Sequence, residues 1–165
     1  MKILATLGAT ALLALGLTTQ ASAVSLSPTS TTFSATGSTS LTKLGITIGC
    51  TASFTGNIDG AGVGHIATAS FSPGSALCSG IGTTGLPWTA TALTSTGSGA
   101  GTGSIAGVAV TTALGNCGPS TLPVTMNTTG VLSFSGASLS GGCTVTGSIQ
   151  TTANTVPPTV VSIVP

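Results

Sequence analysis

Few side chains in this sequence could take part in chemistry. Asp59 is the only acid and His65 the only histidine among 165 residues, and they lie six positions apart. With abundant hydroxyls, a Ser-His-Asp triad is available by residue type. No serine, however, lies in a G-x-S-x-G elbow. We therefore predict no catalytic residue, with Asp59 in a turn and His65 in the strand after it; a secreted hydrolase that uses His65 is the alternative.

Sites for metals, cofactors and nucleic acids need groups that this chain lacks. A calcium loop at residues 57–60 would need several carboxylates, and only Asp59 is present. Nucleic-acid binding needs a field of basic side chains, yet the chain has only Lys2 and Lys43 and no arginine. We predict no cofactor, no metal and no nucleic-acid partner.

The four cysteines are better explained as disulfides than as zinc ligands. They form no C-x-x-C pair, and His65 is not at ligand spacing from any of them. Three pairings are possible, and we favour one bridge in each half of the chain. The favoured bridges are Cys50–Cys78 and Cys117–Cys143.

The N-terminus has the three parts of a secretory signal peptide. A positive start at Lys2 precedes an apolar run over residues 3–17, and a small-x-small cleavage pattern follows at 21–23. The apolar run is shorter than the roughly 20 residues of a spanning helix, so a membrane anchor is the weaker alternative. We predict a signal peptide at 1–23 and one secreted, extracellular domain at 24–165, with no membrane span in the mature protein and disulfides formed in an oxidising compartment.

The elements that would position these residues are β-strands. Apolar and hydroxyl side chains alternate along residues 46–58, 86–92 and 143–150, which is the period of a strand with one buried face. No helical period is sustained after residue 23, and turns are rich in glycine, serine, asparagine and proline. We expect Trp88, the only tryptophan, in the core, and a hairpin turn at 57–62.

We predict an all-β fold, an antiparallel β-sandwich of short strands held by disulfides, with a β-barrel as the alternative. The cysteine pairs and the phrases Ser-Phe-Ser at 70–72 and 133–135 indicate two similar halves, at about 41–93 and 104–150. A Ser/Thr/Gly tract at 94–103 separates them and is predicted to be a loop.

The predicted surface is almost uncharged. Charged residues make up 2% of the chain, and removal of the signal peptide would leave Lys43, Asp59 and His65 as its ionisable side chains. We expect Lys43 to be solvated or to guard a strand edge. Without charge repulsion, the protein is expected to associate with other copies of itself or with apolar–water interfaces. The terminal strand-like segments, 24–26 and 160–164, could add to a neighbour's sheet edge.

Five segments of the sequence resemble one known family. They are residues 34–43 (SATGSTSLTK), 45–56 (GITIGCTASFTG), 85–89 (GLPWT), 116–119 (NCGP) and 163–165 (IVP). Together they resemble the secreted bacterial activators of alkane oxidation, the Pra-type family, over nearly the whole mature chain and with all four cysteines.

The resemblance implies a secreted, non-enzymatic accessory protein that promotes growth on alkanes by dispersing or contacting the oil, at the oil–water or cell-surface interface. It implies no catalytic residues. The alternative function is a structural subunit of extracellular fibres, of a biofilm matrix or of an adhesin, built by strand addition between copies.

Overall fold

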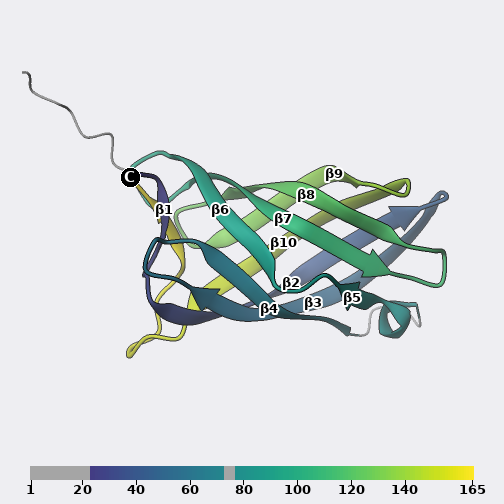
Figure 1. The fold of residues 1–165 in the computed structure, drawn as a ribbon, viewed down its shortest axis with the longest axis horizontal. Helices are drawn as coiled ribbons and strands as arrows, with labels where there is room; N and C mark the ends of the chain where they lie inside the picture. The colour runs from purple at the N-terminus through teal and green to yellow at the C-terminus, as the bar shows by residue number, and fades with distance from the viewer. Residues whose placement is uncertain (1–22, 73–76) are drawn as a thin grey trace, which may run out of the picture.

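The computed structural model describes residues 23–72 and 77–165. The predicted signal peptide, 1–23, therefore lies outside the described residues except for Ala23. The described residues form eleven strands and one short 3₁₀-helix (Figure 1): β1 (Ser25–Ser27), β2 (Thr31–Lys43), β3 (Ile46–Ile58), β4 (Gly64–Ser72), η1 (Cys78–Gly80), β5 (Gly82–Thr84), β6 (Trp88–Ser95), β7 (Gly101–Thr111), β8 (Cys117–Met126), β9 (Val131–Leu139), β10 (Cys143–Ala153) and β11 (Ser162–Val164). This part of the chain contains no helix of the length and apolarity that a bilayer crossing requires.

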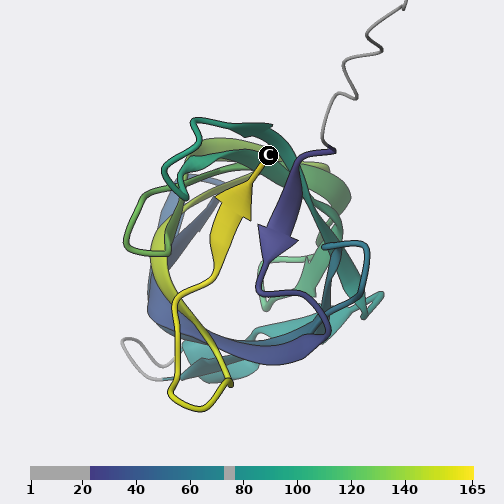
Figure 2. The same cartoon turned by 90° about the vertical axis from the view of Figure 1, so that its left-hand side faces the viewer.

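Eight strands close into an antiparallel barrel (Figures 1 and 2). Each strand pairs with the next along the chain, in the order β2-β3-β4-β6-β7-β8-β9-β10. The last strand then returns to the first, because β10 pairs with β2 along eleven residue pairs, from Cys143–Lys43 to Ala153–Phe33. The short β5 pairs with the end of β7.

The predicted all-β, antiparallel fold is confirmed, and of the two arrangements considered the structure has the barrel rather than the sandwich. Both arrangements bury one face of every strand, so they share the same alternation of apolar and polar residues. The difference lies in the pairing of β2 with β10, which joins strands more than ninety positions apart and closes the sheet. A pairing between strands so far apart produces no hydrophobic period and no residue spacing by which it could be recognised in the sequence.

Strand boundaries follow the alternation closely. The pattern at 46–58 becomes β3 over those same residues, and the pattern at 143–150 lies in β10. The predicted loop at 94–103 is too long, because β6 continues to Ser95 and β7 begins at Gly101. Hydroxyl and glycine residues extend those two strands because Thr94 and Thr102 face each other across the ladder and hydrogen-bond through their side chains.

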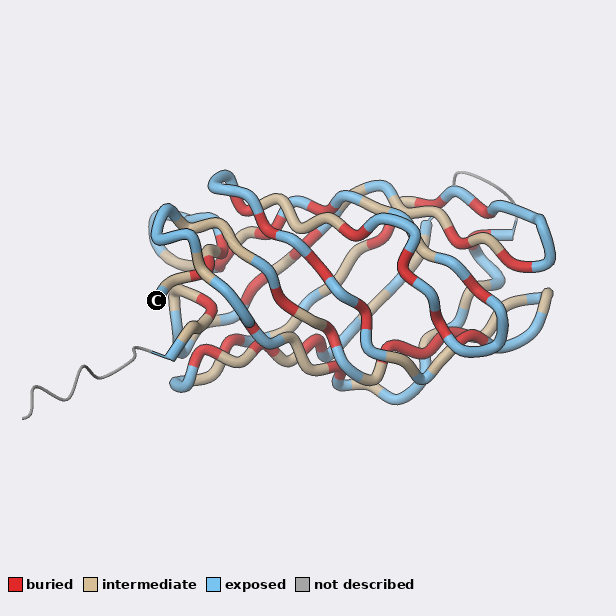
Figure 3. Tube along the Cα trace, turned by 90° about the horizontal axis from the view of Figure 1, so that it is seen from above, coloured by how far each residue is buried: buried red, intermediate tan, exposed pale blue. Residues whose placement is uncertain are grey.

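The core of the molecule is the inside of the barrel. Buried and exposed positions alternate along the strands (Figure 3), so one face of each strand points inward. In β3 the buried positions include Ile48, Cys50, Ala52 and Ile58. Trp88 is only 3% exposed, as the sequence predicts.

The first and last of the described strands form a small sheet across one end of the barrel. β1 and β11 pair antiparallel, and Figure 2 shows them crossing the barrel mouth. The Leu26 N–H donates to the carbonyl of Gly62, and the Ile163 N–H to that of Gly99, each at 2.9 Å, so the sheet is attached to two barrel turns. The strand-like terminal segments thus pair with each other in one chain, where the sequence suggested a neighbour's sheet edge.

Candidate functional site

A cavity with a volume of about 120 Å³ lies inside the barrel. We call it the lumen cavity. Side chains from all eight barrel strands and from both capping strands line it, and nearly all are apolar. Its aliphatic lining includes Leu26, Leu41, Ile48, Ile58, Ile66, Ile105, Val108, Val110, Leu122, Val124, Met126, Leu139, Ile149, Val161 and Ile163.

Every aromatic side chain of the protein lines the lumen cavity. The chain has four phenylalanines, one tryptophan and no tyrosine. The lining contains all five: Phe33, Phe54, Phe71, Trp88 and Phe134. A sugar-binding surface would place aromatic rings on the outside, where they can stack on the ligand. Here the rings instead make the inner wall apolar.

The aromatic side chains of the wall pack in defined pairs. The ring of Phe54 meets that of Phe71 edge-on, at 6.3 Å between centroids and 87° between planes. The same ring lies 6.3 Å from Trp88 at 57°. Across the barrel, the ring of Phe134 lies over Gly147, where an added Cβ would come within 2.7 Å of it. Glycine at 147 therefore provides the space that the ring occupies.

The hydroxyl residues in the lining are Thr39, Ser40, Thr91, Ser104 and Thr151, and the two most buried polar side chains, Trp88 and Thr151, are hydrogen-bonded to the backbone. The Trp88 indole Nε1–H donates to the carbonyl of Thr84 at 2.9 Å, and the Thr151 hydroxyl donates to that of Gly130 at 2.7 Å. In the described residues, every buried side-chain nitrogen and oxygen has a partner. None of Lys43, Asp59 and His65 is among the lining residues. The cavity therefore offers apolar contact and no charge.

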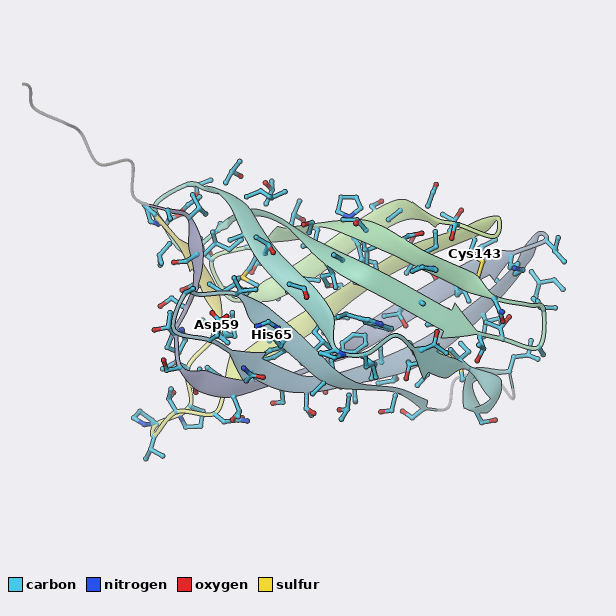
Figure 4. The ribbon with its side chains drawn as sticks, in the orientation of Figure 1. Asp59, His65 and Cys143 are labelled. Atoms are coloured by element: carbon cyan, nitrogen blue, oxygen red, sulfur yellow. A yellow bond between two sulfur atoms is a disulfide. The ribbon has the colours of Figure 1, made fainter. Side chains whose placement is uncertain are left out.

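Asp59 and His65 come together, but as part of a turn. The Nε2 of His65 lies 3.2 Å from Oδ2 of Asp59, and both side chains are partly exposed. The other carboxylate oxygen, Oδ1, accepts the N–H groups of Ala61 and Val63 at 2.9 Å each. These hydrogen bonds, first that of Val63 and then that of the His65 side chain, lower the pKa of Asp59. The pair ties β3 to β4 beside the capped end (Figure 4), which fits the roles in a turn and a strand that the sequence suggested.

The disulfides lie toward the other end of the barrel, which we call the distal end. Cys50 pairs with Cys78 and Cys117 with Cys143, the pairing of one bridge per half that we favoured. The first joins β3 to η1, and the second joins the beginnings of β8 and β10. Cys143 marks this end in Figure 4. No group of three or more histidine, cysteine or acidic residues that could hold a metal occurs in the described ranges.

Lys43 corrects one expectation from the sequence. It was expected to be solvated or to guard an edge, but its side chain is buried, at 8% exposure. Its ammonium donates to the carbonyl of Asn116 at 2.7 Å and to that of Gly141 at 2.9 Å. The turns after β7 and β9 meet the end of β2 here, and the Lys43 ammonium joins all three. Sequence patterns gave no sign of this contact, because the three segments are distant along the chain.

The distal end also carries exposed apolar side chains, which we call the apolar tip: Leu44, Ile46 and Leu77. Their exposed fractions are 79%, 45% and 41%. Leu44 lies in the β2–β3 turn, Ile46 begins β3 and Leu77 precedes η1, so all three lie at the end away from β1 and β11 (Figure 1). The sequence analysis did not identify these residues. The feature that could have indicated them is Leu44 directly before Gly45, an apolar residue in a tight turn.

Leu44 has an unusual backbone conformation for its residue type. Its φ is 52° and that of Gly45 is 79°, the two positive values that a two-residue hairpin turn requires. Asparagine and glycine favour this geometry, whereas a bulky residue there costs about 1 kcal/mol. A leucine that is both strained and exposed is not explained by folding.

One comparison with known proteins is positive. The family model described as "Alkane oxidation protein activator PraA/PraB-like" matches residues 1–160. No curated protein and no solved structure matches the chain. The match covers almost the entire sequence, in agreement with the resemblance noted from the segments around Cys50, Trp88 and Cys117. The chain therefore belongs to the PraA/PraB-like family of alkane oxidation protein activators.

Proposed function

We propose that the protein is a secreted, non-enzymatic accessory factor that promotes the use of alkanes by acting at the oil–water or cell-surface interface. Its family is described as one of activators of alkane oxidation. Its two disulfides suit an oxidising, extracellular compartment. With one acid and one histidine, paired to each other in a turn, the chain has little with which to catalyse an oxidation itself.

The apolar tip is the observation that carries the interfacial role. Leu44 extends from the end of a hairpin with 79% of its surface exposed, in a conformation that another residue would adopt more easily. Contact with a hydrocarbon surface would bury this side chain, and burying a leucine is worth about 1.5–3 kcal/mol. The strain and exposure of Leu44 are then explained by contact with oil.

The rest of the surface presents little electrostatic barrier to such contact. The one lysine of the described residues, Lys43, is buried against carbonyl groups, and Asp59 is paired with His65. A charged surface would have to lose hydration to approach an oil phase, whereas hydroxyl and backbone groups lose less. Adsorption through the distal end would leave the capped end, with β1 and β11, away from the oil.

The test is the substitution Leu44→Asn. Asparagine tolerates the positive φ at this position, so the fold should be retained or slightly stabilised. The loss of one buried leucine should lower adsorption at a hexadecane–water interface by about tenfold or more. The measurement is interfacial tension of a hexadecane drop against protein concentration.

The matched control is Leu93→Asn, which removes a leucine that is 58% exposed on β6, away from the tip. Equal losses in the two variants would mean that general surface hydrophobicity, not the tip, drives adsorption. Deletion of the gene tests the physiological role: growth on hexadecane should fall relative to growth on a soluble carbon source. An unchanged ratio would rule out the role in alkane use.

The alternative, a fibre subunit built by strand addition, has less support from this fold. Strand addition needs a free sheet edge, and the pairing of β2 with β10 removes both edges of the strand meander. The terminal strands β1 and β11 are paired with each other as well. Regular filaments of the protein in electron micrographs of culture supernatant would nevertheless favour the fibre.

A further inference from the structure

We propose that the lumen cavity binds one molecule of a small, uncharged hydrocarbon, with n-hexane as the representative ligand. This proposal goes beyond the interfacial role and stands on the cavity, not on the apolar tip. It would make the protein a carrier of single hydrocarbon molecules as well as a surface-active factor.

The size of the cavity supports a ligand of this class. Eight-stranded barrels have interiors that are either filled by side chains or able to hold one small ligand. The lumen cavity measures about 120 Å³. An apolar cavity of about 150 Å³ lined by leucine, isoleucine and phenylalanine stays free of water and binds benzene. The present cavity is therefore large enough for a molecule of a few carbon atoms.

Small side chains keep this space open. Three alanines, Ala35 on β2 and Ala90 and Ala92 on β6, line the cavity between the bulky residues. Leucine or isoleucine at these positions would direct additional carbon atoms into the space.

The chemistry of the wall selects for a hydrocarbon over a polar analogue. The nearby indole N–H of Trp88 and hydroxyl of Thr151 already donate to carbonyl groups of the backbone. No charged side chain lines the cavity. A carboxylate brought into it would lose its hydration and meet no cationic side chain, which is costly, whereas an alkane loses nothing polar. The site should therefore reject a fatty acid of the same chain length.

The shortest ladder in the barrel wall joins β8 and β9. Their ladder consists of the pairs Thr125–Ser133 and Met126–Leu132 near the capped end. At the distal end the strands are tied through Ser140, whose N–H donates to the hydroxyl of Ser120. Leu122 on β8 and Phe134 on β9 line the cavity next to this seam. The Gly118 N–H also donates to the Ser140 carbonyl, so the strands are held at both ends, and a brief separation between these ends would admit a ligand.

Trp88 provides a direct readout of binding. It lines the cavity, and because the chain has no other tryptophan and no tyrosine, the fluorescence of the protein reports on this one side chain. Titration of the wild-type protein with n-hexane should give a saturable change in emission with one site per chain. Hexanoate at neutral pH should bind more than about tenfold more weakly. Across n-alkanes, affinity should rise about fourfold per methylene until the cavity is full.

Two cavity-filling variants, Ala92→Leu and Ala35→Leu, locate the site. Both should fold with an unfolding temperature equal to or above that of the wild type, and hexane affinity should fall by about tenfold or more. The matched control is Ala106→Leu, which adds the same atoms to an exposed position on β7. Saturating hexane should raise the unfolding temperature of the wild type and of this control, and not that of the filling variants.

Three outcomes would overturn the proposal: no saturable response of wild-type Trp88 to any short alkane, equal affinity for hexane and hexanoate, or unchanged hexane binding in folded Ala92→Leu and Ala35→Leu proteins. If these variants do not fold, the wild-type titrations still decide. The interfacial role is tested separately, because Leu44→Asn should bind hexane like the wild type and Ala92→Leu should adsorb to hexadecane like the wild type.

Discussion

Two turns of the barrel make the same hydrogen bonds around different side chains. In the β3–β4 turn, Oδ1 of Asp59 accepts the N–H groups of Ala61 and Val63. In the β8–β9 turn, Oδ1 of Asn127 accepts those of Thr129 and Val131. A neutral amide thus performs the same structural role as the carboxylate. The turns differ in that Asp59 is charged and contacts His65, whereas Oδ1 of Asn127 also accepts the Thr129 hydroxyl.

Because of this difference, we predict that the free energy of unfolding depends on pH through the ionisation of Asp59. Its pKa is lowered in the folded protein, chiefly by the Val63 N–H, so the ionised form is favoured by folding. The resulting stability is present above the ordinary pKa of about 3.9 and is lost as the pH falls through the folded value. Asp59→Asn keeps the acceptor and removes the titration. Urea unfolding at pH 7 and pH 3 should show a larger loss in the wild type than in the variant.

The reciprocal substitution, Asn127→Asp, is the control. It places a carboxylate on the same two N–H groups, so it should add stability at pH 7 relative to pH 3. If Asp59→Asn and the wild type lost equal stability on acidification, the carboxylate of Asp59 would have no role in the pH response.

At the scale of elements, two of the three shortest strands have a position that their length does not suggest. β1 and β11 have three residues each, yet they form the sheet that crosses one mouth of the barrel (Figure 2). Their central side chains, Leu26 and Ile163, are buried and line the lumen cavity. The hydroxyl of Ser95 donates to the Ile163 carbonyl at 3.2 Å, which fixes β11 to the end of β6.

We predict that Ile163→Ala weakens the fold far more than its position next to the C-terminus suggests. Ile163 is 2% exposed, and truncating a buried isoleucine to alanine costs about 2–5 kcal/mol. Val164→Ala, one position along the same strand and only half-buried, should cost less than about 1.5 kcal/mol. Denaturant unfolding measures both. Similar small losses would show that the terminal sheet frays and does not close the barrel.

At the scale of the whole molecule, closure of the barrel prevents the edge-to-edge pairing that charged side chains prevent in other β-proteins. A sheet with almost no charged gatekeepers would expose edges that pair with other copies. Here β2 and β10 pair along their lengths, and both chain ends are joined in one small sheet. Divided at the β6–β7 turn, the barrel consists of β2-β3-β4-β6 and β7-β8-β9-β10 with one disulfide in each part, although most of β2 precedes the half predicted at about 41–93. Their origin from one repeated unit remains a prediction.

This arrangement predicts that the chain tolerates circular permutation. Ser25 and Val164 are paired neighbours in the terminal sheet, so a short linker can join the ends. New termini in the β6–β7 turn, residues 96–100, would then separate the two halves. The permuted protein should keep both disulfides and the emission of a buried Trp88, with a modest loss of stability. A permutant with its new termini within β3 should not fold, because the cut interrupts the pairing of β3 with β2 and β4. If it folded equally well, continuous strand pairing would not be required for the fold.

Much of the local structure was accessible from the sequence. The period-two pattern identified β3, β6 and β10 and the buried side of each, and it placed Trp88 in the core. Spacing favoured the cysteine pairing that the structure has. Lys43 was wrongly expected in solvent, because its carbonyl partners on Asn116 and Gly141 come from other turns. The convergence of the aromatic residues was missed for the same reason.

The sequence by itself determined that this chain is a nearly uncharged β-protein with little acid–base chemistry, because composition and alternation are properties of neighbouring residues. The tertiary structure alone decided that the sheet closes on itself, that all five aromatic rings surround one cavity and that Leu44 is strained at an exposed tip. These features depend on which distant strands pair and in what register. Alternation is the same for an open sheet and a closed one, so only the paired strands distinguish them.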